Sequence, residues 1–341
     1  MTGRICVISH RWSALCLLLP ALFACEQESL LVISGPTMGT SYTVKAVGEH
    51  LHPGKLREQV ESELRRINGL MSTYDENSEL SRFNRSPVAH AFPVSPEILE
   101  VLKLSGEIFD HSGGAFDVTV GPLVNLWGFG PEPSRDVVPL DEEIEAARQR
   151  IGFGLLQMDD ASLLKTRNIY VDLSAIAKGY AVDRLARILD AQDVENYLIE
   201  IGGELRARGI NDQGSPWTIA VEVPDNMSRS VFRTLELRDM SMATSGDYRN
   251  YFEVDGARYS HTIDPRTGRP ITHNVASVTV LSPSAAMADG YATAINVLGA
   301  EQGLVLAQAQ NLAVLVIIKT EDGFREQLSP ALETYLNENL D

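Results

Sequence analysis

The stretch from Val171 to Asp183 constrains the fold most, because a strand pattern turns into a helix pattern within it. Residues 169–171 form a short apolar run, which predicts a buried strand. From Ser174 onward, apolar residues recur at helical spacing. Such a corner puts free backbone N–H groups beside free carbonyl oxygens, so that it can bind an anion or a cation. Asp172 lies at the corner, and Lys178 follows about one and a half turns into the predicted helix. Alone, the pattern is more typical of a structural joint with a solvated lysine than of a site.

A second corner of this kind precedes Asp289. Ser282-Pro283 predicts the start of a helix that runs through Val297. Asp289 and Thr293 are four residues apart on this helix and therefore share a face. A carboxylate and a hydroxyl at that spacing offer two hard oxygen ligands, which suit Mg²⁺. The pair is weak evidence by itself, because Asp289 can also interact with its own helix N-terminus while Thr293 lies at the edge of the core.

Residues 1–24 are typical of an export signal rather than of the fold. Arg4 and Arg11 are basic, and the apolar core that follows is too short to span a bilayer. Leu22-Phe23-Ala24-Cys25 resembles a bacterial lipobox, in which Cys25 is lipidated and becomes the mature N-terminus. We therefore expect a periplasm-facing protein that is anchored to a bacterial membrane only through Cys25. The alternative is an ordinary cleaved signal with a chance cysteine.

Cysteine usage and charge narrow the function classes. All three cysteines lie at or before Cys25, so the remaining chain has no disulfide and no thiol for catalysis or metal binding. The net charge of −17 argues against nucleic acid and anionic lipid headgroups as partners. A ligand that carries phosphate would therefore need a metal ion, a lysine or a helix N-terminus to bind.

Helices and strands alternate without a strict βαβ order, which predicts an α+β fold rather than a doubly wound sheet. No linker-like segment or internal repeat divides the chain, so we expect a single domain over residues 25–341. This domain can consist of two lobes. The predicted strands are 30–34, 41–47, 197–201, 217–223, 233–237, 275–281 and 312–318, with a hairpin over 251–262 that turns at Asp255-Gly256. The predicted helices are 56–71, 95–110, 141–151 and 282–297.

Common catalytic motifs are missing from the sequence. It contains no P-loop, no G-x-G-x-x-G, no serine-centred elbow and no H-E-x-x-H. His261 follows the predicted hairpin beside a turn, where a lone histidine is more often a hydrogen-bonded turn residue than a base. Met38, Tyr74 and Phe116 taken one at a time are better explained as core residues.

Several longer motifs nevertheless occur together in one order. The chain resembles the ApbE family of FAD:protein FMN transferases over essentially its whole length after the leader. The motifs are Gly35 to Tyr42 (GPTMGTSY), Met71 to Asp75 (MSTYD), Ser81 to Asn84 (SRFN), Gly113 to Asp117 (GGAFD), Gly121 to Gly130 (GPLVNLWGFG), Asp172 to Gly179 (DLSAIAKG), Gly202-Gly203, Ala243 to Tyr248 (ATSGDY), Ser260 to Pro270 and Ala288 to Thr293. The resemblance implies a single ApbE-type domain, related to the T-fold, with the ligand cleft between its lobes.

The resemblance also implies roles for individual residues. Asp289 and Thr293 match magnesium ligands, and Ala175 matches a position that binds the metal through its backbone carbonyl; Mn²⁺ can replace Mg²⁺. Asp172 and Lys178 match positions that contact FAD, although some relatives have glutamate at the lysine site. The flavin pocket is matched by Met38, Tyr74, Ala115, Phe116, Asp117 and Ile263, and the region of the reacting phosphates by Ser245, Gly246 and His261.

The implied reaction is attack by a threonine or serine hydroxyl of another protein on the FMN-side phosphorus of FAD, with release of AMP. His261 is the candidate base for that hydroxyl, and Asp264 is a candidate to orient it. By resemblance, the acceptors are flavoproteins such as periplasm-facing subunits of sodium-pumping quinone reductase or Rnf-type complexes. Two alternatives remain open: a metal-dependent FAD pyrophosphatase that uses the same site, and a flavin-binding lipoprotein without turnover.

Overall fold

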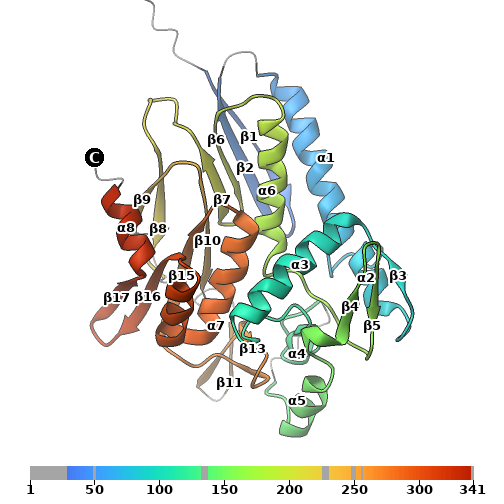
Figure 1. The fold of residues 1–341 in the computed structure, drawn as a ribbon. Coiled ribbons are helices and arrows are strands. Elements are labelled where there is room, and N and C mark those ends of the chain that lie inside the picture. The colour runs from blue at the N-terminus through green and yellow to red at the C-terminus, as the bar shows by residue number, and fades with distance from the viewer. Residues whose placement is uncertain are drawn as a thin grey trace, which may run out of the picture.

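An antiparallel sheet forms the centre of the molecule (Figure 1). The computed structural model describes residues 29–48, 51–131, 137–224, 230–246, 251–254 and 256–338, so the predicted leader, Cys25 and Asp255 lie outside the described residues. Within these ranges, eight strands pair in the order β1-β2-β6-β7-β10-β15-β16-β17, each antiparallel to its neighbour. The bounds are β1 Leu30–Thr37, β2 Thr40–Val47, β6 Asn196–Ile201, β7 Glu204–Arg208, β10 Met240–Gly246, β15 Val275–Ser282, β16 Ala313–Thr320 and β17 Gly323–Leu328.

One face of the sheet is covered by helices. α6 (Ala177–Asp190) and α7 (Ala285–Ala309) lie on this face, and α1 (Pro53–Met71) and α3 (Pro96–His111) pack against them (Figure 1). The stripe of apolar residues predicted for α1 is buried in the main core together with the inward residues of β6 and β15. All eight residues of β15 are buried because this central strand has cover on both faces.

The opposite face has a smaller cover. The hairpin of β8 (Trp217–Glu222) and β9 (Val231–Leu237) and the helix α8 (Pro330–Glu338) lie over it. Alternate residues of β10 and β16 therefore point into two different cores, as expected for a sheet that is buried on both sides.

The remaining elements stand beside the sheet, toward the right and the bottom of Figure 1. They include α2 Glu79–Arg85, β3 Phe92–Pro93, α4 Gly121–Leu126, α5 Asp141–Arg148, the 3-10 turn Phe153–Leu155, β4 Leu156–Met158 and β5 Ser162–Lys165, and two short hairpins: β11 Tyr251–Val254 with β12 Ala257–Ser260, and β13 Ile263–Asp264 with β14 Arg269–Pro270. A third core cluster joins α4, α5 and the hairpins. The α+β prediction is confirmed. None of the described helices is long and apolar enough to cross a membrane.

The prediction of a strand at residues 169–171 is wrong, because these residues do not pair in a ladder. Only a single parallel bridge, between Val120 and Tyr170, is present there. The side chain of Asn84 takes the place of a neighbouring strand, because its amide donates to the carbonyl of Val171 and its oxygen accepts from the Val171 N–H, both at 2.8 Å. Both backbone groups of Val171 are thus hydrogen-bonded without a ladder.

The start of α6 also differs from the prediction. The Asp172 carboxylate accepts from the Ser174 N–H at 2.9 Å and from its hydroxyl at 2.6 Å, which keeps residues 172–174 in a turn. α6 therefore begins at Ala177, and Lys178 lies in its first turn rather than one and a half turns along. At the other corner the N-cap is Ser284, whose side chain accepts from the Met287 N–H. α7 continues beyond the predicted end to Ala309, across a break at Gly299 (φ 79°).

α6 and α7 approach so closely that only glycine fits between them. A Cβ built on Gly179 would lie 2.2 Å from the carbonyl oxygen of Ala285 and 2.9 Å from Cα of Ala286. Because these neighbours are backbone atoms, the two helices would have to separate to admit a methyl group.

We predict that Gly179→Ala lowers the free energy of unfolding by about 1–3 kcal/mol, the usual cost of overpacking a close contact. The matched control is Gly69→Ala in α1, where nothing lies within 4 Å of the added Cβ. That change should be neutral or stabilising by up to about 1 kcal/mol. Urea unfolding measures both, and equal effects of the two variants would contradict the close approach.

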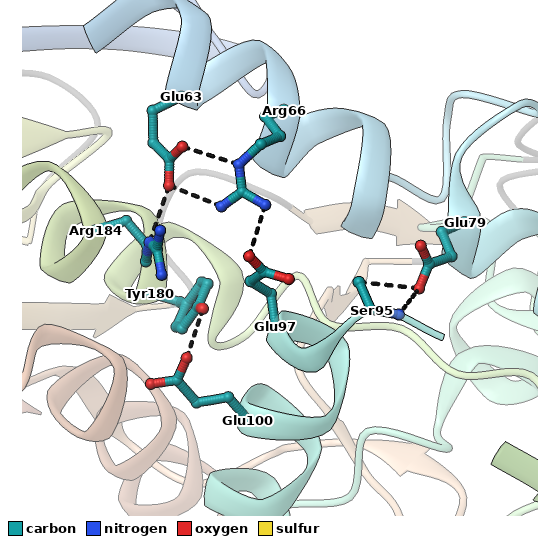
Figure 2. Close-up of polar contacts among 8 residues, drawn as sticks. All are labelled: Glu63, Arg66, Glu79, Ser95, Glu97, Glu100, Tyr180 and Arg184. Atoms are coloured by element: carbon teal, nitrogen blue, oxygen red, sulfur yellow. Dashed lines mark hydrogen bonds and ion pairs between the residues drawn. The ribbon is translucent and has the colours of Figure 1, made fainter. Parts of the chain in front are cut away.

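A network of ion pairs joins α1, α3 and α6 (Figure 2). Glu63 of α1 is its centre, since it accepts from Arg66 at 2.8 and 2.9 Å and from Arg184 of α6 at 2.9 Å. Arg66 also reaches Glu97 of α3 at 2.7 Å. Because the Glu63 side chain is only 12% exposed, this network is better shielded from solvent than a surface pair.

We predict that Glu63→Gln lowers the free energy of unfolding by about 1–2 kcal/mol at pH 7, because two guanidinium groups lose their shared charge partner. Hydrogen bonds from Arg66 hold the pKa of Glu63 below its usual value. Its contribution is therefore present above the unfolded pKa of about 4.3 and is lost as the pH falls through the lower folded pKa.

The difference between wild type and Glu63→Gln should accordingly shrink when unfolding is repeated below about pH 4. Glu145→Gln is the control, since Glu145 makes an exposed i,i+3 pair with Arg148 and should cost less than about 0.5 kcal/mol. A difference for Glu63→Gln that grows toward acidic pH would contradict this assignment.

Candidate active site

A cavity of about 430 Å³ opens where the first turns of α6 and α7 meet strands β7 and β10. Its wall also includes residues between 115 and 129 and the segment 261–265 after the β11–β12 hairpin. Of the site residues that the sequence predicts, all but Met38 and Asp264 line this cavity. They are Tyr74, Ala115, Phe116, Asp117, Asp172, Ala175, Lys178, Ser245, Gly246, His261, Ile263, Asp289 and Thr293.

The two corners of the chain meet at Asp289. Its Oδ2 atom accepts a hydrogen bond from the Gly179 N–H at 3.1 Å, and the Lys178 Nζ lies 3.8 Å from the same atom. Asp289 is only 3% exposed. Burial raises the pKa of its carboxyl, while Lys178 and the Gly179 N–H act in the opposite direction. A carboxylate is thus held inside the protein by a helix N-terminus and one ammonium group.

Three residues that offer oxygen atoms suited to a hard cation, Asp289, Thr293 and Ala175, line the cavity. Thr293 lies one turn after Asp289, and its hydroxyl is 3.1 Å from the Ser245 hydroxyl of β10. Ala175 lines the same cavity at the corner before α6. Within the described ranges, no group of three or more His, Cys, Asp or Glu side chains could hold a metal ion. A carboxylate, a hydroxyl and a backbone carbonyl fit a Mg²⁺ ion that keeps part of its water, as Mg²⁺ commonly does.

Glu204 is a site residue that the sequence interpretation missed. It begins β7 directly after Gly202-Gly203, is 4% exposed, and its Oε1 atom accepts from the Lys178 Nζ at 3.0 Å. Its Oε2 atom is buried and has no hydrogen-bond partner in the described structure. Burial and the nearby Asp289 raise the pKa of Glu204 above its usual value, against the effect of Lys178. An acidic residue immediately after a glycine pair was the signal that could have indicated it.

Lys178 is charged despite its surroundings. Burial works against its ammonium form, yet the carboxylates of Asp289 and Glu204 raise the pKa of Lys178 above its usual value. Lys178 therefore carries a fixed positive charge at neutral pH, between two acidic groups.

Two further predicted carboxylates are partly engaged by local turns. The Asp117 Oδ1 atom accepts from the N–H and the hydroxyl of Thr119 at 2.8 and 2.7 Å. Burial raises the pKa of Asp117, and these hydrogen bonds oppose the rise. Asp172 holds the turn at Ser174 with its Oδ1 atom, as described above. Each residue therefore shapes the cavity wall as well as facing the cavity.

An apolar wall completes the cavity. Phe116 is buried, Phe129 and Ile263 also line the wall, and Tyr74 is 70% exposed beside them. Aromatic and aliphatic surfaces of this kind suit a flat, polarizable ring system. Met38 lies instead in the β1–β2 turn with φ 46° and packs against the main core, so it is not brought to the cavity.

His261 lies where the β11–β12 hairpin ends, and its ring forms a T-shaped pair with Phe129, with 6.3 Å between the ring centroids. Asp264 is a less suitable partner for it than the sequence indicated. Both Asp264 oxygens accept from the guanidinium of Arg266, at 3.0 and 2.9 Å, which fixes the turn at residues 264–268. The placement of His261 thus comes from the hairpin and its aromatic neighbours.

Known proteins share this architecture. The Vibrio cholerae flavin transferase ApbE has a TM-score of 0.84 at 47% identity, over 90% of this chain and 99% of that one. The apo flavinyl transferase ApbE of Pseudomonas stutzeri also has a TM-score of 0.84, at 41% identity, over 90% and 96% of the two chains.

Relatives in sequence cover nearly the whole chain. A Vibrio cholerae protein named FAD:protein FMN transferase is 49% identical over 93% of this chain and 96% of its own length. An Escherichia coli K12 protein of the same name is 39% identical over 94% and 96%. The model of the ApbE family matches residues 38–316. Because the family model and these relatives match nearly the whole chain, this chain belongs to the ApbE family.

Proposed function

We propose that this chain is an FAD:protein FMN transferase, which moves FMN from FAD to a threonine or serine hydroxyl of an acceptor flavoprotein and releases AMP. The observation that carries the proposal is the meeting of the two corners at Asp289, inside a cavity with an apolar wall on another side. The names of the sequence relatives support the coarser part of the proposal, since they describe transfer of FMN from FAD to a protein.

The cavity offers two environments to the two parts of the substrate. The flavin ring of FAD would lie against Phe116, Phe129 and Tyr74, and the pyrophosphate would lie toward Asp289 and Lys178. Mg²⁺, or Mn²⁺ in its place, would be held by Asp289, Thr293 and the Ala175 carbonyl, and would neutralise the phosphate oxygens. Lys178 would add a second positive charge on the same side.

In the proposed step, the acceptor hydroxyl oxygen forms a bond to the FMN-side phosphorus, and the bond from that phosphorus to the bridging oxygen breaks. AMP leaves with that oxygen, and the hydroxyl proton passes to His261, a suitable base at neutral pH. The exposure of Tyr74 at the cavity leaves room for a protein segment to approach.

We also propose that the protein faces the periplasm and is lipid-anchored through Cys25, which lies outside the described residues. Its acceptors would then be periplasm-facing flavoprotein subunits, such as those of sodium-pumping quinone reductase or Rnf-type complexes. The acidic character of the chain and the short apolar leader support an exported protein that does not bind nucleic acid.

Incubation with FAD, Mg²⁺ and an acceptor flavoprotein tests the function directly. Flavin fluorescence that stays on the acceptor band in a denaturing gel, with an equal amount of AMP, is the expected result. Free FMN and AMP with an unlabelled acceptor would instead indicate a pyrophosphatase, and unchanged FAD would indicate binding without turnover.

Asp289→Ala should reduce transfer by about 10²-fold or more, the scale for loss of one electrostatic stabiliser of a transition state. Chelation of the divalent cation with EDTA should have the same effect on wild type and little further effect on the variant. Asp289→Asn, which keeps an acceptor for the Gly179 N–H, separates a charge effect from unfolding. Undiminished transfer in folded Asp289→Asn would remove Asp289 from the cation site.

His261→Ala should leave FAD bound, measured by quenching of flavin fluorescence, but slow transfer by about 10²–10⁴-fold, the range for a general base. His90→Ala is the matched control, because His90 is exposed and lies outside the cavity. If His261→Ala transfers within a few-fold of wild type, His261 is a turn residue rather than the base.

A further inference from the structure

Lys178 lies between two buried carboxylates at the cavity wall. Its Nζ is 3.0 Å from Glu204 Oε1 and 3.8 Å from Asp289 Oδ2. The two acidic side chains are 6% and 4% exposed, so neither charge is balanced by bulk water. Lys178 is also the only lysine or arginine among the described residues that line the cavity.

The two contacts are unequal. At 3.0 Å, Lys178 donates a hydrogen bond to Glu204, whereas 3.8 Å to Asp289 is too long for one. The Asp289 Oδ2 atom receives the Gly179 N–H instead. The ammonium group is therefore bound to β7 and only near the carboxylate of α7.

This arrangement matters for any cation at Asp289. An ammonium group bonded directly to that carboxylate would occupy the position where a divalent ion binds, and would repel the ion as a like charge. A second carboxylate that is hydrogen-bonded to the lysine competes with Asp289 for the ammonium group. In this chain Glu204 is placed to do so.

We propose that Glu204 is a positioning residue that holds Lys178 off Asp289 and thereby sets the divalent-cation affinity of the site. The proposal rests on the proposed function only in taking Asp289 as a ligand of the cation. It assigns to Glu204 an effect that passes through Lys178, so the effect needs the lysine to be present.

A direct role for Glu204 is the competing explanation. Its Oε2 atom is buried without a hydrogen-bond partner in the described structure, and it could accept from a ligand in the cavity. A double-mutant cycle separates the two roles, because only an indirect role vanishes when Lys178 is replaced.

The experiment uses Mn²⁺ alone, without FAD, and measures free Mn²⁺ by EPR during titration of wild type, E204Q, K178M and the double variant. We expect E204Q to weaken Mn²⁺ binding about tenfold or more, the scale for loss of a group that supports a metal ligand. In the K178M background, E204Q should change the affinity by less than about threefold. The same factor in both backgrounds would overturn the proposal.

Two controls make the result specific. Glu195→Gln removes the same charge from an exposed position and should leave Mn²⁺ affinity unchanged. Thermal unfolding without the cation checks that E204Q and K178M are folded. Asp289→Ala distinguishes the two hypotheses: if it binds Mn²⁺ as wild type does, the proposed cation site itself fails. If it loses binding but the cycle is additive, only the role of Glu204 fails.

Discussion

The reciprocal bonding of α6 and α7 is the interaction on which the site depends. Asp289 of α7 accepts from the Gly179 N–H in the first turn of α6. In return, Asp183 of α6 accepts from the N–H groups of Ala285 and Ala286 in the first turn of α7, at 2.9 and 3.0 Å. Each helix thus satisfies N-terminal donors of the other with a carboxylate, which also suits both helix dipoles. The missing Cβ of Gly179 allows this proximity, so the geometry at Asp289 follows from backbone contact rather than from flexible side chains.

The layers around this pair explain why it stays in place. The sheet packs against one side of α6 and α7. The ion pairs centred on Glu63 join α6 to α1 and α3 (Figure 2). Tyr180, the residue after Gly179, also donates to Glu100 of α3 at 2.7 Å. Cavity residues on α6 are therefore fixed on several sides, whereas His261 comes from a short hairpin with its own small aromatic core.

Some of this could be predicted from the sequence and some could not. The mixed order of helices and strands predicted the α+β class, and the local sequence pattern predicted α1, α3 and β15. It failed at residues 169–171, where the Asn84 side chain replaces strand pairing, since a contact across 87 residues leaves no local pattern. It missed Glu204 for a similar reason, because the pairing with Lys178 arises from the sheet order. Met38 was assigned to the flavin pocket by resemblance alone, and its turn keeps it against the core.

Charge connects the fold to the proposed chemistry. Four acidic residues, Asp117, Asp172, Glu204 and Asp289, line the cavity with Lys178 as the one lysine or arginine among the described lining residues. A pyrophosphate that enters such a cavity meets net negative charge, in a chain that is already strongly acidic. Asp289 and Thr293 would hold a divalent cation at this wall, and such a cation would lower that electrostatic cost by neutralising charge on the phosphate oxygens. The acidic wall therefore does not argue against a phosphate-bearing substrate: it favours one that arrives together with a cation.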